Sequence, residues 1–425
     1  MSTNARLTAD AAPSEHDPTL REVVERLAPL ERRAGSDGER EAAEWIRGRL
    51  ADAGCEARVE EERFKDGYAP ALAALSALGA ASGAAALTRR GRLAGAIGGA
   101  LAAALIADDI SNGPRVLRRA VGSEKTTWNV IAEAGDASAE RTLVVMAHHD
   151  AAPTGLIFDD SAQAAAGKAF PGVIERIDTS LPLWWPVAGS PALIAIGAAR
   201  RNARLVTAGV VGCVGSAVAF ADIARSPVVP GANDNLSAVA ALVALAEAAR
   251  RRPIPGLRLL LVSCGAEEVL QGGVYGFVRN QLKRLDRERT WVLNLDTVGS
   301  PELIMVEGEG AIVMEDYFDR SFRDLVAAAA ERAGLPLRRG MRARTSTDAV
   351  VTSRAGYPTA NLTSWNRYKA LSNYHKPSDT PENLRYSTVA HAVAISEAVA
   401  RALAHEAAAP GSERPAEMAG RSREE

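Results

Sequence analysis

From Arg141 to the C-terminal region, short apolar runs alternate with longer amphipathic segments, and this alternation limits the possible folds more than any other feature. The runs at residues 142–147, 257–263 and 291–295 have the length and composition of buried strands. Segments with helical spacing of apolar residues lie between and after them. Strands that alternate with helices in this way are typical of a parallel sheet with helices on both faces. We therefore predict an α/β fold with a mostly parallel, mixed sheet.

Capping residues and changes of period set the boundaries of the expected elements. Ser36 and Glu39 form a capping box at the start of one helix, and Gly54 ends that helix. The expected helices span residues 19–30, 36–52, 237–250, 315–333 and 388–406. The expected strands span residues 55–64, 127–134, 142–147, 257–263, 291–295 and 359–363.

Composition and charge narrow the classes of function. The chain has 425 residues, which is long enough for one large α/β domain or for two ordinary ones. Its formal net charge of -2 gives no reason to expect a nucleic acid as a partner. The three cysteines, Cys55, Cys213 and Cys264, cannot form a paired disulfide framework. Residues 1–18 lack the apolar core of a cleavable signal peptide, so none is expected.

Two pairs of uncharged, apolar segments interrupt the alternating pattern. They span residues 69–88 and 93–107, then 181–199 and 205–221, and a connector with three arginines joins each pair. Their lengths of 15 to 20 residues are near the ~20 residues that a helix needs to cross a bilayer. Their many small residues would allow close helix packing in lipid. We predict hydrophobic hairpins in a multi-pass protein of the cell membrane. The alternative is two soluble helical hairpins packed on the domain or on a partner subunit.

We expect one domain with two hydrophobic insertions. The domain spans residues 18–405, and the insertions occupy residues 69–107 and 181–221. The tails at residues 1–17 and 407–425 are polar or charged and are expected to be disordered.

The strands at residues 55–64, 127–134 and 142–147 are expected to pair as an antiparallel meander. The first and third strands of a meander run in the same direction, so the segments that follow them leave the same edge of the sheet. The two hydrophobic pairs follow these strands, and we expect them to emerge together and to pack as a four-helix bundle. The connector arginines favour a cytoplasmic position for the connectors, but other arginines flank the opposite ends. The side of the membrane on which the domain lies therefore stays open.

Five short motifs place histidine or carboxylate side chains after predicted strands or at the start of a helix. In open α/β sheets, such loops converge at the carboxyl ends of the strands. Each motif alone has a simpler explanation, such as a helix N-cap, an Asx turn or an acidic surface turn. Together they supply the imidazoles and carboxylates of a metal-dependent hydrolytic site. The motifs are His148-His149-Asp150, Gly231-Ala-Asn-Asp234-Asn-Leu-Ser237, Glu267-Glu268, Asp296 and Tyr374-His375-Lys-Pro-Ser-Asp379-Thr380.

These motifs resemble those of metallopeptidase family 28, the co-catalytic di-zinc aminopeptidases and their relatives. The resemblance rests on A-H-H-D, G-A-N-D-N-x-S, G-A-E-E, N-L-D-T-V-G and Y-H-K-P-S-D-T, in this order. It covers residues 18–64, 124–160 and 228–405, and it leaves out both hydrophobic pairs. Two positions depart from the family pattern. Thr347-Asp348-Ala349 stands where relatives often have S-D-H, and Ala238 stands where glycine is usual.

The resemblance implies a centre with two zinc ions. His148 and Asp296 would bind one ion, and Glu268 and His375 would bind the other. Asp234 would bridge the two ions. A shared carboxylate is needed because two cations a few ångström apart repel each other.

The resemblance also implies a role for Glu267, and the residues themselves suggest roles for Asp150 and Asp379. Glu267 would be the general base, since adjacent side chains diverge and Glu268 is the ligand. Asp150 would orient His148 through the second ring nitrogen of that imidazole. Asp379 could orient His375 in the same way.

The implied activity is the release of N-terminal amino acids from peptides by a membrane-associated zinc aminopeptidase. Among enzymes, the alternative is a carboxypeptidase or another amide hydrolase that uses the same site. A non-catalytic membrane receptor or scaffold of the same fold is the alternative of another class. The expected partners are peptides with a free N-terminus and the membrane lipid around the hydrophobic hairpins. The sequence leaves the oligomeric state open.

Overall fold

A nine-stranded sheet forms the centre of the structure, a computed structural model that describes residues 15–408. The strand order is β1-β2-β4-β3-β5-β9-β6-β7, and β8 pairs with β6. The four strands in the middle, β4, β3, β5 and β9, run parallel, and antiparallel strands flank them on both sides. The strands are β1 (Glu56–Lys65), β2 (Glu124–Gly135), β3 (Thr142–His148), β4 (Arg258–Cys264), β5 (Thr290–Leu295), β6 (Glu302–Glu309), β7 (Glu315–Asp316), β8 (Arg338–Ala343) and β9 (Thr359–Trp365).

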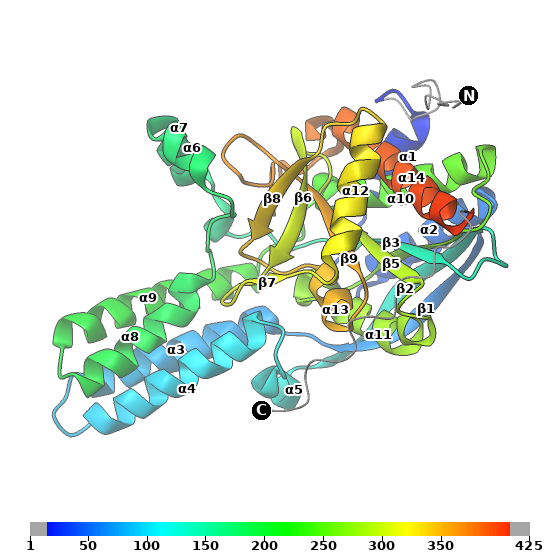
Figure 1. Cartoon of the computed structure of the whole chain (residues 1–425). Coiled ribbons are helices and arrows are strands. Elements are labelled where there is room, and N and C mark those ends of the chain that lie inside the picture. The colour runs from blue at the N-terminus through cyan, green and yellow to red at the C-terminus, as the bar shows by residue number, and fades with distance from the viewer. Residues whose placement is uncertain (1–14, 409–425) are drawn as a thin grey trace, which may run out of the picture.

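Helices cover both faces of this sheet, as the alternating sequence pattern predicted (Figure 1). Side chains of β3 alternate between the two faces because successive residues of a strand point to opposite sides. Leu143 and Val145 belong to one core, and Val144 and Met146 belong to the other. The first core is covered by α1 (Pro18–Leu27), α2 (Asp37–Asp52), α10 (Ser237–Arg251), α12 (Arg320–Arg332) and α14 (Tyr386–Ala408), and the second by α11 (Gly272–Asn280) and α13 (Asp348–Arg354). The predicted α/β fold is confirmed.

The predicted meander of the first three strands is wrong. β2 pairs with β1 and β4, whereas β3 lies between β4 and β5. Every residue of β3 is buried, and strands that are apolar on both faces occupy the middle of parallel sheets. β1 and β3 nevertheless run in the same direction, because β1 is antiparallel to β2, β2 is antiparallel to β4, and β4 is parallel to β3. The segments that follow β1 and β3 therefore leave the same edge of the sheet.

Two predicted helix starts can be compared with the structure, and one of them differs. The helix expected over residues 315–333 begins only at Arg320, because Glu315–Asp316 forms β7 and the Asp319 side chain caps the helix at Ser321 N (2.8 Å). The cap at Ser36 is present, since its hydroxyl accepts a hydrogen bond from Glu39 N at 3.1 Å. Of the tails predicted to be disordered, residues 1–17 and 407–425, most lie outside the described residues. The prediction is wrong for residues 407–408, because α14 continues to Ala408.

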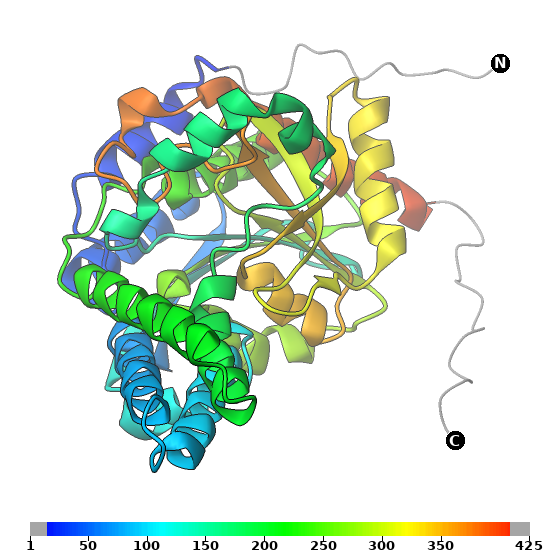
Figure 2. The same cartoon turned by 90° about the vertical axis from the view of Figure 1, so that its left-hand side faces the viewer.

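Both apolar pairs form helices, and the four helices lie side by side in a bundle that extends from the sheet (Figures 1 and 2). They are α3 (Tyr68–Ala86), α4 (Arg92–Ile110), α8 (Trp185–Ala199) and α9 (Ala203–Ile223). Glycines let them approach closely: a Cβ added at Gly83 would lie 2.3 Å from Val210 Cγ2. Within residues 15–408, α3, α4 and α9 are long and apolar enough to cross a membrane, and α8 is shorter.

Short elements connect the bundle to the sheet. α5 (Val116–Val121) lies between α4 and β2. The 3-10 turn η2 (Leu156–Phe158), α6 (Ser161–Ala169) and α7 (Pro171–Arg176) lie between β3 and α8. The base of the bundle packs on the turn η4 (Glu267–Val269) through an apolar cluster that includes Tyr68, Phe220 and Val269.

Candidate metal centre

The predicted site residues converge at the carboxyl ends of the parallel strands. His148 is the last residue of β3, Glu267 and Glu268 follow β4, and Asp296 follows β5. Asp234 comes from the turn Ala232–Leu236 before α10, and His375 comes from the loop after β9. Parallel strands that end at one edge bring residues distant in sequence to a single place.

The arrangement is centred on Asp234. Its Oδ1 lies 3.3 Å from His148 Nε2, and its Oδ2 lies 3.3 Å from His375 Nε2. Each carboxylate oxygen therefore faces a different imidazole. Asp296 completes one group of possible ligands with His148 and Asp234, and Glu268 completes a second group with Asp234 and His375. Within each group the ligand atoms lie within 4.8 Å of one another.

The chain itself compensates only part of the negative charge at this site. Burial and neighbouring negative charges raise the pKa of Glu268 to about 7 and the pKa of Asp296 to about 6. Burial alone would raise the pKa of Asp234, but the nearby imidazoles of His148 and His375 outweigh it and hold this pKa below its ordinary value. Buried carboxylates at such a density are costly unless cations accompany them.

Several polar atoms of the site have no hydrogen-bond partner among the described residues. They include the buried atoms Glu268 Oε1 and His375 Nε2, and this nitrogen is the one that faces Asp234. Imidazole nitrogens and carboxylate oxygens are the ligands that Zn²⁺ prefers alongside thiolates. The unpartnered atoms, the clustered carboxylates and the two facing imidazoles fit a centre for divalent cations.

Asp150 holds the backbone of the turn that carries Glu267 and Glu268. It is fully buried, and it accepts hydrogen bonds from Glu267 N (2.9 Å) and Glu268 N (3.0 Å). Its Oδ1 lies 3.4 Å from His148 Nδ1. The orienting role of Asp150 toward His148 stays a prediction, whereas the two bonds to backbone N–H groups hold the turn that carries Glu267 and Glu268.

Asp379 does not orient His375, contrary to the prediction. Its carboxylate accepts hydrogen bonds from Asn233 N (2.8 Å) and Asp234 N (3.1 Å), and so it holds the turn that presents Asp234. His375 is positioned by aromatic packing instead. Its ring stacks on Tyr374 with centroids 3.8 Å apart and meets the ring of Phe158 edge-on at 4.5 Å.

The sequence motifs did not indicate Gln271, which holds Glu267 in place. Its side-chain amide donates hydrogen bonds to Glu267 Oε1 (2.9 Å) and to Ser346 O (2.9 Å). Glu267 Oε2 then faces the centre, 4.0 Å from His148 Nε2. Gln271 adopts a left-handed conformation, with φ of 63°, which directs its buried side chain back toward Glu267. Its place four residues after Glu267 is the one signal that the sequence offered.

Glu39 also supports the site, in addition to its predicted role at the start of α2. One of its oxygens accepts from Gly35 N (2.6 Å), and the other accepts from Ala266 N (2.8 Å) and Thr127 Oγ1 (2.6 Å). Ala266 immediately precedes Glu267, so this buried carboxylate fixes the start of the turn. The predicted capping box is formed only in part, because Glu39 accepts from Gly35 N while Ser36 N donates to Arg33 O.

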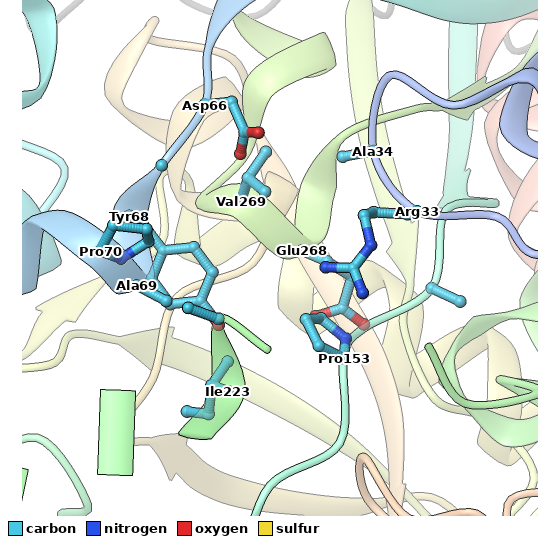
Figure 3. Close-up of a pocket in the computed structure, with 13 residues that line it drawn as sticks. Arg33, Ala34, Asp66, Tyr68, Ala69, Pro70, Pro153, Ile223, Glu268 and Val269 are labelled. Carbon is cyan, nitrogen blue, oxygen red and sulfur yellow. The ribbon is translucent and has the colours of Figure 1, made fainter. Parts of the chain in front are cut away.

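Two cavities adjoin the centre. The larger has a volume of about 400 Å³ and is lined by Glu267, Asp296 and His375 together with residues of the bundle. The smaller, of about 120 Å³, lies where Arg33 and Tyr68 flank Glu268 (Figure 3). The larger cavity falls within the range of about 300–1,000 Å³ that is usual for ligand pockets. This cavity therefore joins the centre to the base of the bundle and has room for part of a substrate.

The C-terminal half of the chain carries a family signature that agrees with this geometry. Residues 217–400 match the model of peptidase family M28. The resemblance that the five motifs predicted is therefore confirmed. No curated protein matches the chain.

Solved structures of aminopeptidases and of a glutaminyl cyclase share this fold. An aminopeptidase from Aneurinibacillus sp. strain AM-1 superposes with a TM-score of 0.52 at 17% identity, over 94% of each chain. A zinc aminopeptidase from Bacillus subtilis gives a TM-score of 0.50 at 14% identity, over 90% of this chain and 92% of the other. A glutaminyl cyclase from Bacteroides thetaiotaomicron gives 0.54 at 13% identity, over 92% and 99%. At these identities, the similarity establishes the fold alone.

Proposed function

We propose that this chain, whose resemblance to peptidase family M28 is established, is a membrane-associated aminopeptidase that uses two zinc ions to remove N-terminal residues from peptides. One observation supports the pair of ions more than any other. The two oxygens of Asp234 face two different imidazoles at 3.3 Å each, which is the arrangement expected of a bridging carboxylate. His148 and Asp296 would complete one ion's ligands, and Glu268 and His375 would complete the other's.

The chain's own residues would handle the protons of the reaction. Zinc, when bound, supplies Lewis-acid polarisation of the scissile carbonyl and activates a water molecule. Glu267 would take the proton of the attacking water and pass it to the leaving amine, as a general base and then as a general acid. Gln271 occupies one oxygen of Glu267 and leaves the other facing the centre. The Glu267 carboxylate is thus held in one orientation.

The outer surface of the bundle supports membrane insertion. On α4, Leu93, Ile97 and Leu101 are 73%, 60% and 51% exposed, and they are spaced four residues apart, so they form a continuous apolar stripe on one side. On α9, Val211 and Val218 are likewise exposed. In water such a surface would be a liability, whereas in lipid it needs no cover. We therefore propose lipid as the partner of the bundle.

The activity is tested on detergent-extracted protein with chromogenic aminoacyl substrates, with and without a zinc chelator. We expect hydrolysis that chelation abolishes and zinc restores, and that Glu267→Gln removes while zinc stays bound. The same substrates with a blocked α-amine should not be hydrolysed; if they are, the enzyme is another amide hydrolase. An N-terminal glutaminyl peptide that loses ammonia but keeps its first residue would point instead to a cyclase.

Membrane insertion is tested by fractionating cells that express the full chain. The protein is expected in the membrane fraction after an alkaline wash and in solution only after detergent. Recovery in the soluble fraction as an assembly of several copies would instead mean that a partner subunit covers the stripe.

A further inference from the structure

The larger cavity connects the candidate metal centre to the base of the helical bundle. Glu268 and His375 are part of its lining. Trp184 and Val187 of the α8 region and Phe220 of α9 contribute to its lining from the bundle. Trp184 and Val187 belong to the predicted hydrophobic insertion 181–221, so this part of the wall comes from the bundle and not from the sheet.

The wall supplied by the bundle is apolar and aromatic. The rings of Trp184 and Phe220 are stacked, with centroids 6.2 Å apart and planes 16° from parallel. Val187 and Ile223 are buried beside them. None of these four side chains carries a charge. A charged substrate group placed against them would lose its hydration without gaining a partner, whereas an apolar group gains from leaving water.

We propose that the base of the bundle is the pocket for the side chain of the substrate's N-terminal residue, and that it selects large apolar side chains. This inference rests on the proposed aminopeptidase activity. The scissile bond must lie at the metal centre, so the side chain next to it can extend toward the bundle. The bundle then has two functions: it holds the enzyme in the membrane and it determines substrate preference.

The test compares kcat/KM for alanyl, leucyl and tryptophanyl substrates in the full chain extracted in detergent. We expect the parent enzyme to prefer leucyl over alanyl substrate by at least about tenfold, since a methylene in an apolar pocket changes selectivity by roughly 10–200-fold. Val187→Phe fills the pocket and should lower the leucyl-to-alanyl ratio by about tenfold. Phe220→Ala enlarges the pocket and should raise the tryptophanyl-to-leucyl ratio. A fraction of misfolded enzyme changes all rates equally, so the ratios report the pocket itself.

Val218→Ala is the matched control, because Val218 lies on the same helix as Phe220 but is 60% exposed on the outer surface. It should leave both ratios unchanged. Hydrolysis with ratios that neither pocket variant alters would overturn the pocket and leave the aminopeptidase proposal standing. Absence of hydrolysis of every aminoacyl substrate by the zinc-loaded parent would overturn both proposals.

Discussion

Replacing Asp150 by asparagine should weaken zinc binding although Asp150 is not itself a proposed ligand. The carboxylate is fully buried and accepts hydrogen bonds from Glu267 N at 2.9 Å and Glu268 N at 3.0 Å. Its Oδ1 also lies 3.4 Å from His148 Nδ1. An asparagine side chain occupies the same volume but has one oxygen. In either orientation its NH₂ group points at a backbone N–H, so one hydrogen bond is lost and one buried donor is left without a partner.

The size of the effect follows from these contacts. A hydrogen bond to a charged group contributes about 1.5–3 kcal/mol. If the lost bond serves to hold the zinc ligands, the same energy appears as weaker binding, and about 1.4 kcal/mol corresponds to a tenfold change. The range agrees with the loss of roughly 10–100-fold in metal affinity that follows removal of a partner behind a ligand. We therefore expect the dissociation constant for zinc to rise by about 10–100-fold.

The assay is a competition for zinc between the protein and a chromophoric chelator, with the melting temperature of the metal-free protein measured in parallel. Asp286→Asn is the matched control, because Asp286 is exposed and precedes β5 at the opposite end of that strand from Asp296. The control should bind zinc like the parent. If Asp150→Asn also binds zinc with the parent's affinity, whether or not its melting temperature falls, Asp150 does not organise the ligands and the reasoning is refuted.

Three further variants test other parts of the structure. Glu267→Gln should lower kcat/KM by about 10²–10⁴-fold in steady-state assays with unchanged zinc content, and retained activity would exclude Glu267 as the base. Arg118→Met leaves the buried Asp109 without its partner and should cost about 3–5 kcal/mol in thermal unfolding, most of which Asp109→Leu should restore in the double variant. Gly83→Leu should disrupt the bundle, seen as aggregation during detergent extraction, because even a Cβ there meets a side-chain atom at 2.3 Å; Gly215→Leu, with open space, should not.

The central strands could be predicted from the sequence because their apolar runs are local signals. β3, β4 and β5 are buried almost throughout, and their lengths and ends follow directly from composition. Their neighbours could not be predicted in the same way. β8 contains three arginines and a glycine and buries only Met341 and Ala343, so no alternation of apolar residues marks it. It pairs with β6 in an irregular register at the margin of the sheet, where tertiary contacts override local preference.

In the candidate site, too, some features could be predicted from local sequence signals and others could not. The meeting of the five proposed ligands was predictable because most of them end a strand, follow one or precede a helix, and the topology brings these ends together. The supporting contacts were not, because they depend on the direction of each side chain. Asp379 was expected to orient His375 by analogy with Asp150, but the turn aims it at Asn233 N and Asp234 N instead. Gln271 reaches Glu267 through a left-handed backbone conformation that no local pattern in the sequence announces.

The most direct test of the two-ion centre is the zinc content of the purified chain after equilibration with excess zinc and removal of unbound metal, measured by inductively coupled plasma mass spectrometry. We predict two zinc ions per chain in the parent and fewer in His148→Ala and in His375→Ala, because each variant removes an imidazole that faces a different oxygen of Asp234. A parent protein that holds a single ion, or none, would contradict the account.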